Sequence, residues 1–153
     1  MSTTPFHIEP FRNCILVTLR GKWDMSTNIQ YLAKLSDCLK TRKGRPFHLF
    51  VDMRGWQIPK SDTFNQIKAP IKLDRRSQLS ETWLEDNATD ADHIAQKFFT
   101  TPSGKLGFEL ERTQSISEFI THCEEKADKI VLDYVRTWIC LLYTSDAADD
   151  RMR

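Results

Sequence analysis

Two short stretches of the sequence, GKWD and RGWQ, carry side chains that could form a binding site. Each follows a segment typical of a β-strand and contains a tryptophan close to charged residues. If the two strands are parallel neighbours, both indoles reach the same sheet edge, and open α/β sheets bind ligands at the carboxyl ends of their strands. Aromatic walls with a charged rim would make a small pocket. The residues expected there are Trp23, Asp24, Asp52, Arg54 and Trp56.

The same residues have a simpler interpretation, because tryptophan packs in a core more often than it contacts a ligand. Trp23 and Trp56 would then close the core, and the charged groups beside them would be solvated. Asp24 and Asp52 could form an acid–base couple, which needs one carboxylate with a raised pKa beside an ionised one. They could equally be a helix-start acid and a turn former.

No motif in the chain indicates a common enzyme class. The patterns G-x-x-x-x-G-K-[ST], G-x-G-x-x-G, H-E-x-x-H and G-x-S-x-G are missing from the sequence. The four cysteines share no C-x-x-C spacing and the four histidines are scattered, which favours buried thiols over a zinc site. We therefore expect no enzymatic activity, no catalytic residue, no cofactor and no metal site.

The charge is nearly balanced, with 22 basic and 21 acidic residues and a formal net charge of +1. Such a chain has no overall field to attract nucleic acid or an anionic membrane. A local basic face could bind an anionic partner, although a solvated helix face is more usual; its residues are Lys60, Lys68, Lys72, Arg75 and Arg76. The apolar runs are far shorter than the roughly 20 residues that span a bilayer. The first ten residues do not resemble a secretory signal, so we expect no transmembrane segment and a cytoplasmic location.

Hydrophobic periodicity predicts alternating strands and helices. Two extended segments joined by a polar turn around Arg12 and Asn13 predict a hairpin, and the apolar run CILV favours a central second strand. The predicted strands are 6–10, 14–20, 47–51, 79–86 and 106–112, and the predicted helices are 25–43, 61–71, 90–100 and 115–139. The order β-β-α-β-α-β-α-β-α predicts an α/β fold: a single mixed or mostly parallel sheet of about five strands with helices packed on it.

The first and last of these helices carry more specific expectations. In the first, Ser26 or Thr27 is the expected cap, and an apolar stripe faces inward, made of Ile29, Leu32, Leu35 and Leu39. In the last, Ser115 or Ser117 is the expected cap, and the inward residues are Ile116, Phe119, Ile120 and Cys123.

Taken together, these segments resemble a known family. The strand pair running into LRGKWD, the helix NIQYLAKLSDCLK, the strand FHLFVDMRGW, and the later HIAQKFF with LGFELERTQSISEFI resemble the STAS/SEC14-like small bacterial proteins. These are relatives of the sulfate-transporter and anti-sigma-factor-antagonist domain. The resemblance covers about residues 6–125 and rests on element order and apolar pattern.

The resemblance implies a regulatory module that docks a partner protein through the face around its second helix, here 61–71. Some members bind a nucleotide or an apolar ligand, so a small-ligand or lipid-binding domain using the sheet end near Trp23 and Trp56 is the alternative. In the anti-sigma-factor antagonists, a phosphorylatable serine follows the strand-end aspartate. Asp52 fits that aspartate, but no Ser-Ser-Gly follows it. Ser61 is therefore either a regulatory phosphosite or a helix cap.

The last stretch, CLLYTSDAADDRMR, reads differently from the rest. Its first ten residues can be written codon by codon as the read-through of a widely used transposase-type sequencing adapter; an unrelated natural tail is the alternative. We therefore expect residues 1–139 to be a single STAS-like α/β domain with a truncated C-terminal helix. Residues 140–153 are expected to be a non-native tail on a metagenomic fragment.

Overall fold

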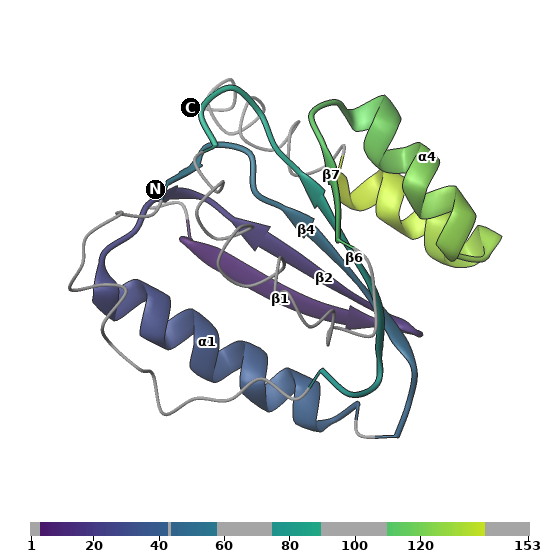
Figure 1. Cartoon of the computed structure of the whole chain (residues 1–153), viewed down its shortest axis with the longest axis horizontal. Helices are drawn as coiled ribbons and strands as arrows, with labels where there is room; N and C mark the ends of the chain where they lie inside the picture. The colour runs from purple at the N-terminus through teal and green to yellow at the C-terminus, as the bar shows by residue number, and fades with distance from the viewer. Residues whose placement is uncertain (1–3, 43, 58–74, 90–109, 140–153) are drawn as a thin grey trace, which may run out of the picture.

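A computed structural model describes residues 4–42, 44–57, 75–89 and 110–139, and it shows an α/β fold (Figure 1). The main sheet has five strands in the order β1-β2-β4-β6-β7. Its strands are β1 Phe6–Phe11, β2 Cys14–Leu19, β4 Phe47–Asp52, β6 Gln78–Leu84 and β7 Leu110–Thr113. The predicted mixed, mostly parallel sheet is therefore confirmed: β1 pairs antiparallel with β2, and each later pairing is parallel.

The N-terminal hairpin forms as the sequence predicts. β1 and β2 pair in register from Phe6 opposite Leu19 to Phe11 opposite Cys14. Arg12 takes a left-handed conformation with φ of 53° in the turn, which lets the chain reverse within two residues. All six residues of β2 are buried, because the strand lies between β1 and β4 and has helices over both faces.

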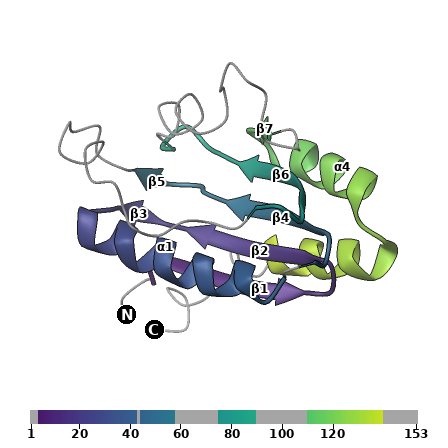
Figure 2. The same cartoon turned by 60° about the horizontal axis from the view of Figure 1, so that its bottom comes forward.

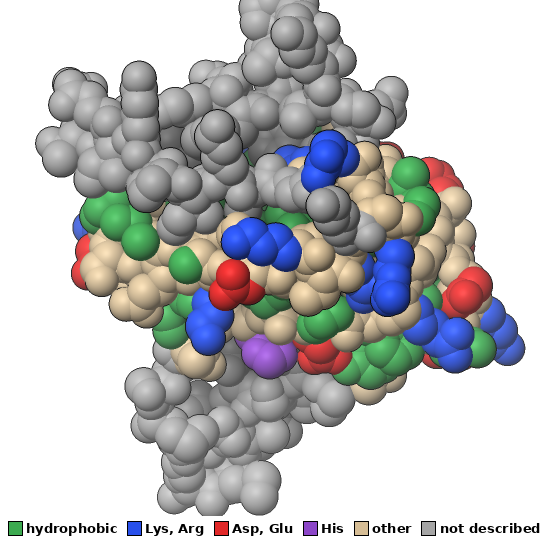
Figure 3. Space-filling model, turned by 90° about the horizontal axis from the view of Figure 1, so that it is seen from below, with side chains coloured by type: hydrophobic (Ala, Val, Ile, Leu, Met, Phe, Trp, Pro, Cys, Tyr) green, Lys and Arg blue, Asp and Glu red, His purple; other side chains and the backbone are tan. Residues whose placement is uncertain are grey.

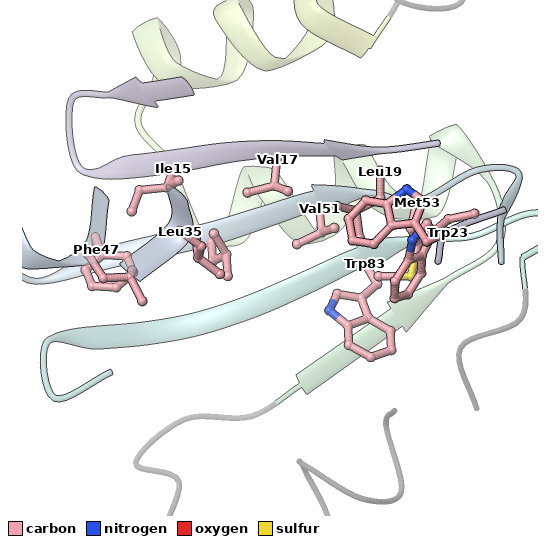
Figure 4. Close-up of a cluster of buried hydrophobic side chains, with 12 residues drawn as sticks. Ile15, Val17, Leu19, Trp23, Leu35, Phe47, Val51, Met53 and Trp83 are labelled. Atoms are coloured by element: carbon pink, nitrogen blue, oxygen red, sulfur yellow. The ribbon is translucent and has the colours of Figure 1, made fainter. Parts of the chain in front are cut away.

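Helices cover both faces of the sheet (Figure 2). Helix α1, Met25–Lys40, packs on one face, and α4, Ile116–Lys126, packs on the other together with a final helix at 129–139. Alternate residues of β2, β4 and β6 enter the two resulting cores. Figure 4 shows the core beneath α1, in which Ile15 and Val17 of β2 lie beside Phe47 and Val51 of β4.

Three expectations about the helices prove wrong. Asp24, and not Ser26 or Thr27, caps α1. Ile29 is 38% exposed, because the core stripe of α1 follows Leu35 and Leu39 while Ile29 lies on another side of the helix. Ile116 is also 38% exposed, whereas Phe119 and Cys123 are buried as expected and Ser115 is the cap.

The predicted last helix is in fact two helices. α4 stops at Lys126, where Ala127 adopts an extended conformation with φ of −115° and ψ of 149°. Asp128 then accepts a hydrogen bond from the Val131 amide at 2.9 Å, as an N-cap residue does. The predicted helices 61–71 and 90–100 and most of the predicted strand 106–112 lie outside the described residues.

Candidate functional site

The carboxyl ends of β2, β4 and β6 meet at one sheet edge, where the sequence predicts the site. Past this edge the chain adds a small parallel sheet of β3, Gly21–Lys22, and β5, Trp56–Gln57, with Gly21 opposite Trp56. Gly55 has a φ of 75°, a conformation that costs glycine nothing because it has no Cβ. This turn brings Trp56 back beside the segment that carries Trp23. The structure therefore gathers most of the predicted residues at one edge.

The two tryptophans contact each other in the core. Trp23 is 2% exposed and Trp56 is 4% exposed, and their ring centroids lie 5.3 Å apart at an interplanar angle of 78°. Phe6 and Tyr31 pack edge-to-face on Trp23, with centroids 6.0 and 5.3 Å away. The Trp23 indole donates a hydrogen bond to the carbonyl of Arg20 at 2.9 Å. The indole nitrogen of Trp56, also buried, has no hydrogen-bond partner in the described part of the chain.

Asp24 serves the start of α1. Its carboxylate accepts hydrogen bonds from the backbone amide and the hydroxyl of Thr27, both at 2.8 Å. The backbone bond from Thr27 and then the side-chain bond hold the pKa of this exposed carboxyl below its usual value. These partners make Asp24 a helix cap, one of the two roles that the sequence left open.

Asp52, at the end of β4, is a fully buried carboxylate shared by two arginines. Arg20 donates to its Oδ2 at 2.7 Å and to its backbone carbonyl at 2.9 Å. Arg54 donates to Oδ1 through Nε at 2.9 Å and to Oδ2 through Nη2 at 2.8 Å. Burial by itself would raise the pKa of Asp52, but the hydrogen bonds from Arg54 and Arg20 outweigh it and hold the pKa below its usual value. Asp52 is therefore ionised at neutral pH.

A second ion pair continues this edge on β6 and β7. Arg112 donates to both oxygens of Glu85, at 2.7 and 2.8 Å, in the bidentate geometry that arginine favours. The guanidinium of Arg112 also lies 5.6 Å from the centre of the Trp83 ring. Arg20, Glu85 and Arg112 are not among the residues that the sequence predicts for this site. Arg20 directly follows β2 and Glu85 directly follows β6, but neither position by itself indicates the partner.

Two other sequence predictions concern Ser61 and the basic face. Ser61 and the lysines of the predicted basic face lie outside the described residues. Arg75, from the same predicted face, donates to the Glu81 carboxylate at 2.7 Å, and Glu81 also accepts a bond from the Trp83 indole at 2.6 Å. Arg75 is thus part of a polar network that includes a buried carboxylate.

Acid should weaken the fold through Asp52. The unfolded chain protonates this aspartate near its ordinary pKa of about 3.9, whereas the folded pKa is lower. The stabilisation is therefore complete above about pH 5 and is lost as the pH falls through the folded pKa. The urea midpoint of the wild type should fall as the pH is lowered across this range, and the midpoint of Asp52→Asn should fall less. Because the pKa of Asp24 is also lowered, the stability of Asp52→Asn keeps some dependence on pH. Equal falls in the two proteins would contradict the role given to Asp52.

Comparison with known proteins identifies no relative. No family model matches the chain, and no curated protein or solved structure matches it significantly. In the described part of the chain, no helix has the length and apolar character needed to cross a membrane.

Proposed function

We propose that this chain is a non-enzymatic regulatory or protein-interaction module of the STAS-like type. The observation that carries this proposal is that the strand-end carboxylates are already engaged. Asp52 is held ionised by two arginines, Glu85 is paired with Arg112, and Asp24 caps a helix. General acid catalysis needs a carboxyl with a raised pKa, whereas the pKa values of Asp24 and Asp52 are both lowered. The edge therefore resembles a structural clamp, by which we mean the ion pairs of Asp52 with Arg20 and Arg54, more than a reactive centre.

A small-ligand domain is the second candidate, and one observation favours it. The indole N–H of Trp56 is buried at the predicted site and has no acceptor among the described residues. Most buried donors have a partner, and a bound molecule with an acceptor atom could supply one. Against this candidate function, Trp23 and Trp56 pack directly on each other, so neither ring is left exposed to line a ligand pocket.

The docking surface that we propose is an apolar stripe on the outer side of α1. Met25 and Leu32 are half-buried and Ile29 is 38% exposed, and their spacing of three and four residues places them on one helix face. Figure 3 views the molecule from the α1 side and shows hydrophobic, basic and acidic side chains intermixed. Mixed charge around an apolar stripe suits a protein partner better than a nucleic acid.

A charge on the stripe should break this contact. We expect Ile29→Asp to weaken binding to the partner protein about tenfold or more, because a carboxylate would be buried against an apolar surface. Gln30→Asp is the matched control: it makes the same change of charge at the next, also exposed, residue of α1. A partner is captured with the tagged wild-type chain from a bacterial lysate, purified, and titrated against the three proteins. Equal affinities of Ile29→Asp and wild type would refute the α1 surface.

A further inference from the structure

The sheet face under α4 brings together three side chains of types that bind metals. Glu111 comes from β7, and His122 and Glu125 come from α4; their ligand atoms all lie within 4.8 Å of one another. His122 and Glu125 are three residues apart and so share one side of the helix. His122 Nδ1 contacts Glu111 Oε2 and lies 3.9 Å from Glu125 Oε2. Two ligands about 2.1 Å from one zinc ion lie within about 4.2 Å of each other, so a small movement of side chains would complete a site.

The hydrogen bonding at this cluster is incomplete in the described residues. His122 Nδ1 is shielded from solvent and makes no hydrogen bond of normal geometry, although the Glu111 carboxylate lies against it. The Glu111 oxygen that faces Nδ1 can be compensated either by a proton on that nitrogen or by a bound cation. Thr82, fully buried and directly opposite Glu111 in the β6–β7 register, also has a hydroxyl without a partner. Buried polar atoms of this kind usually have a partner.

The local charge leaves room for a cation. Lys126 pairs with Glu111 Oε1, which leaves the other oxygen of that carboxylate facing His122. The side chains of Glu111, Glu125 and Lys126 together carry a formal charge of −1. An imidazole combined with carboxylates suits zinc and similar divalent transition metals, whereas calcium and magnesium prefer oxygen ligands throughout.

We propose that Glu111, His122 and Glu125 bind a divalent transition-metal ion of the zinc class, contrary to the sequence expectation of no metal site. Because the ligands come from a strand and a helix, the ion would tie α4 to the edge strand β7. An ion that binds only the folded chain stabilises it against unfolding. This inference concerns the α4 face and is independent of the docking surface on α1.

Calorimetric titration with Zn²⁺ tests the proposal, on a chain from which any histidine tag has been removed. The wild type should bind one ion, and His122→Ala and Glu125→Gln should each weaken binding by about tenfold or more. The Glu125 side chain is 62% exposed, so its loss should leave the fold intact. Glu124→Gln is the matched control, since Glu124 pairs with Arg136 at 2.8 Å, outside the cluster, and it should bind Zn²⁺ as the wild type does.

Thermal unfolding with and without Zn²⁺ gives a second readout. At a Zn²⁺ concentration close to the wild-type Kd, the metal should raise the Tm of the wild type and of Glu124→Gln, and should raise that of His122→Ala or Glu125→Gln much less. A wild-type chain that binds no Zn²⁺ would overturn the proposal. Unchanged binding in His122→Ala and Glu125→Gln would also overturn it, because the ion would then lie elsewhere, for example at a thiol.

Discussion

Replacing Asp52 with asparagine should lower the free energy of unfolding by about 3–5 kcal/mol, the usual cost of removing one partner from a buried ion pair. The substitution keeps the shape of the side chain but removes the charge that holds Arg20 and Arg54. Both guanidiniums are largely buried, with side chains 17% and 14% exposed. They would keep the desolvation cost of two cations without the carboxylate that compensates it. Urea unfolding followed by circular dichroism measures the change.

Asp24→Asn is the matched control for this prediction. Asparagine is as good an N-cap as aspartate, so the variant should unfold close to the wild-type midpoint. The sequence allows both aspartates in one acid–base couple, but the two variants should differ clearly in this experiment. If Asp52→Asn unfolds at the same urea concentration as Asp24→Asn, the clamp on Asp52 contributes little to the fold.

Trp23→Ala should destabilise the fold by about 3–5 kcal/mol, as is typical of truncating a buried tryptophan. The side chain is 2% exposed and packs against Phe6, Tyr31 and Trp56. Figure 4 shows it at the end of the core, beside Leu19 and Met53. Truncation would leave a cavity that these rings cannot close, and the hydrogen bond to Arg20 would be lost. Chemical denaturation at constant pH provides the measurement.

Ile130→Ala provides the comparison for Trp23→Ala. Ile130 is 53% exposed on the final helix, and substitutions at such surface positions usually change stability by less than about 0.5 kcal/mol. A Trp23→Ala variant as stable as Ile130→Ala would mean that the indole is not a core residue. The ligand-wall interpretation of Trp23 would then become the better one.

The sequence predicts the sheet well because its strands are strongly patterned. β2 and β4 are apolar on both faces, and only a central position in a sheet buries both faces of a strand. The turn at Arg12 and Asn13 also lies where the alternation of apolar residues breaks off. The gathering of Trp23 and Trp56 follows from the same reasoning, since parallel neighbours must end at the same edge.

Errors in the prediction arise where the local sequence offers several acceptable alternatives. Asp24, Ser26 and Thr27 are all acceptable caps, and the structure uses Asp24, whose carboxylate reaches the Thr27 amide and hydroxyl. An apolar pattern alone did not show that Ile29 belongs to a second stripe of α1. The break after Lys126 had a local signal in Asp128, a good cap residue, which the continuous apolar pattern obscured.

The charged partners of the site could not be read from sequence spacing. Arg20 lies 32 residues from Asp52 and reaches it only because β2 and β4 are parallel neighbours. Glu111 and His122 meet only because α4 folds back over β7. An arginine at a strand end and a histidine on a helix both look like surface residues until the neighbouring element is known.

Native mass spectrometry of the chain purified without refolding tests most directly whether this edge of the sheet is a structural clamp in an interaction module. We predict the mass of the polypeptide, alone or with protein subunits, and no small organic molecule. The mass of one added zinc ion would concern the cluster on α4 and not this edge. A small molecule retained in stoichiometric amount, and lost in Trp56→Phe, would contradict the interaction module and establish the ligand-binding alternative.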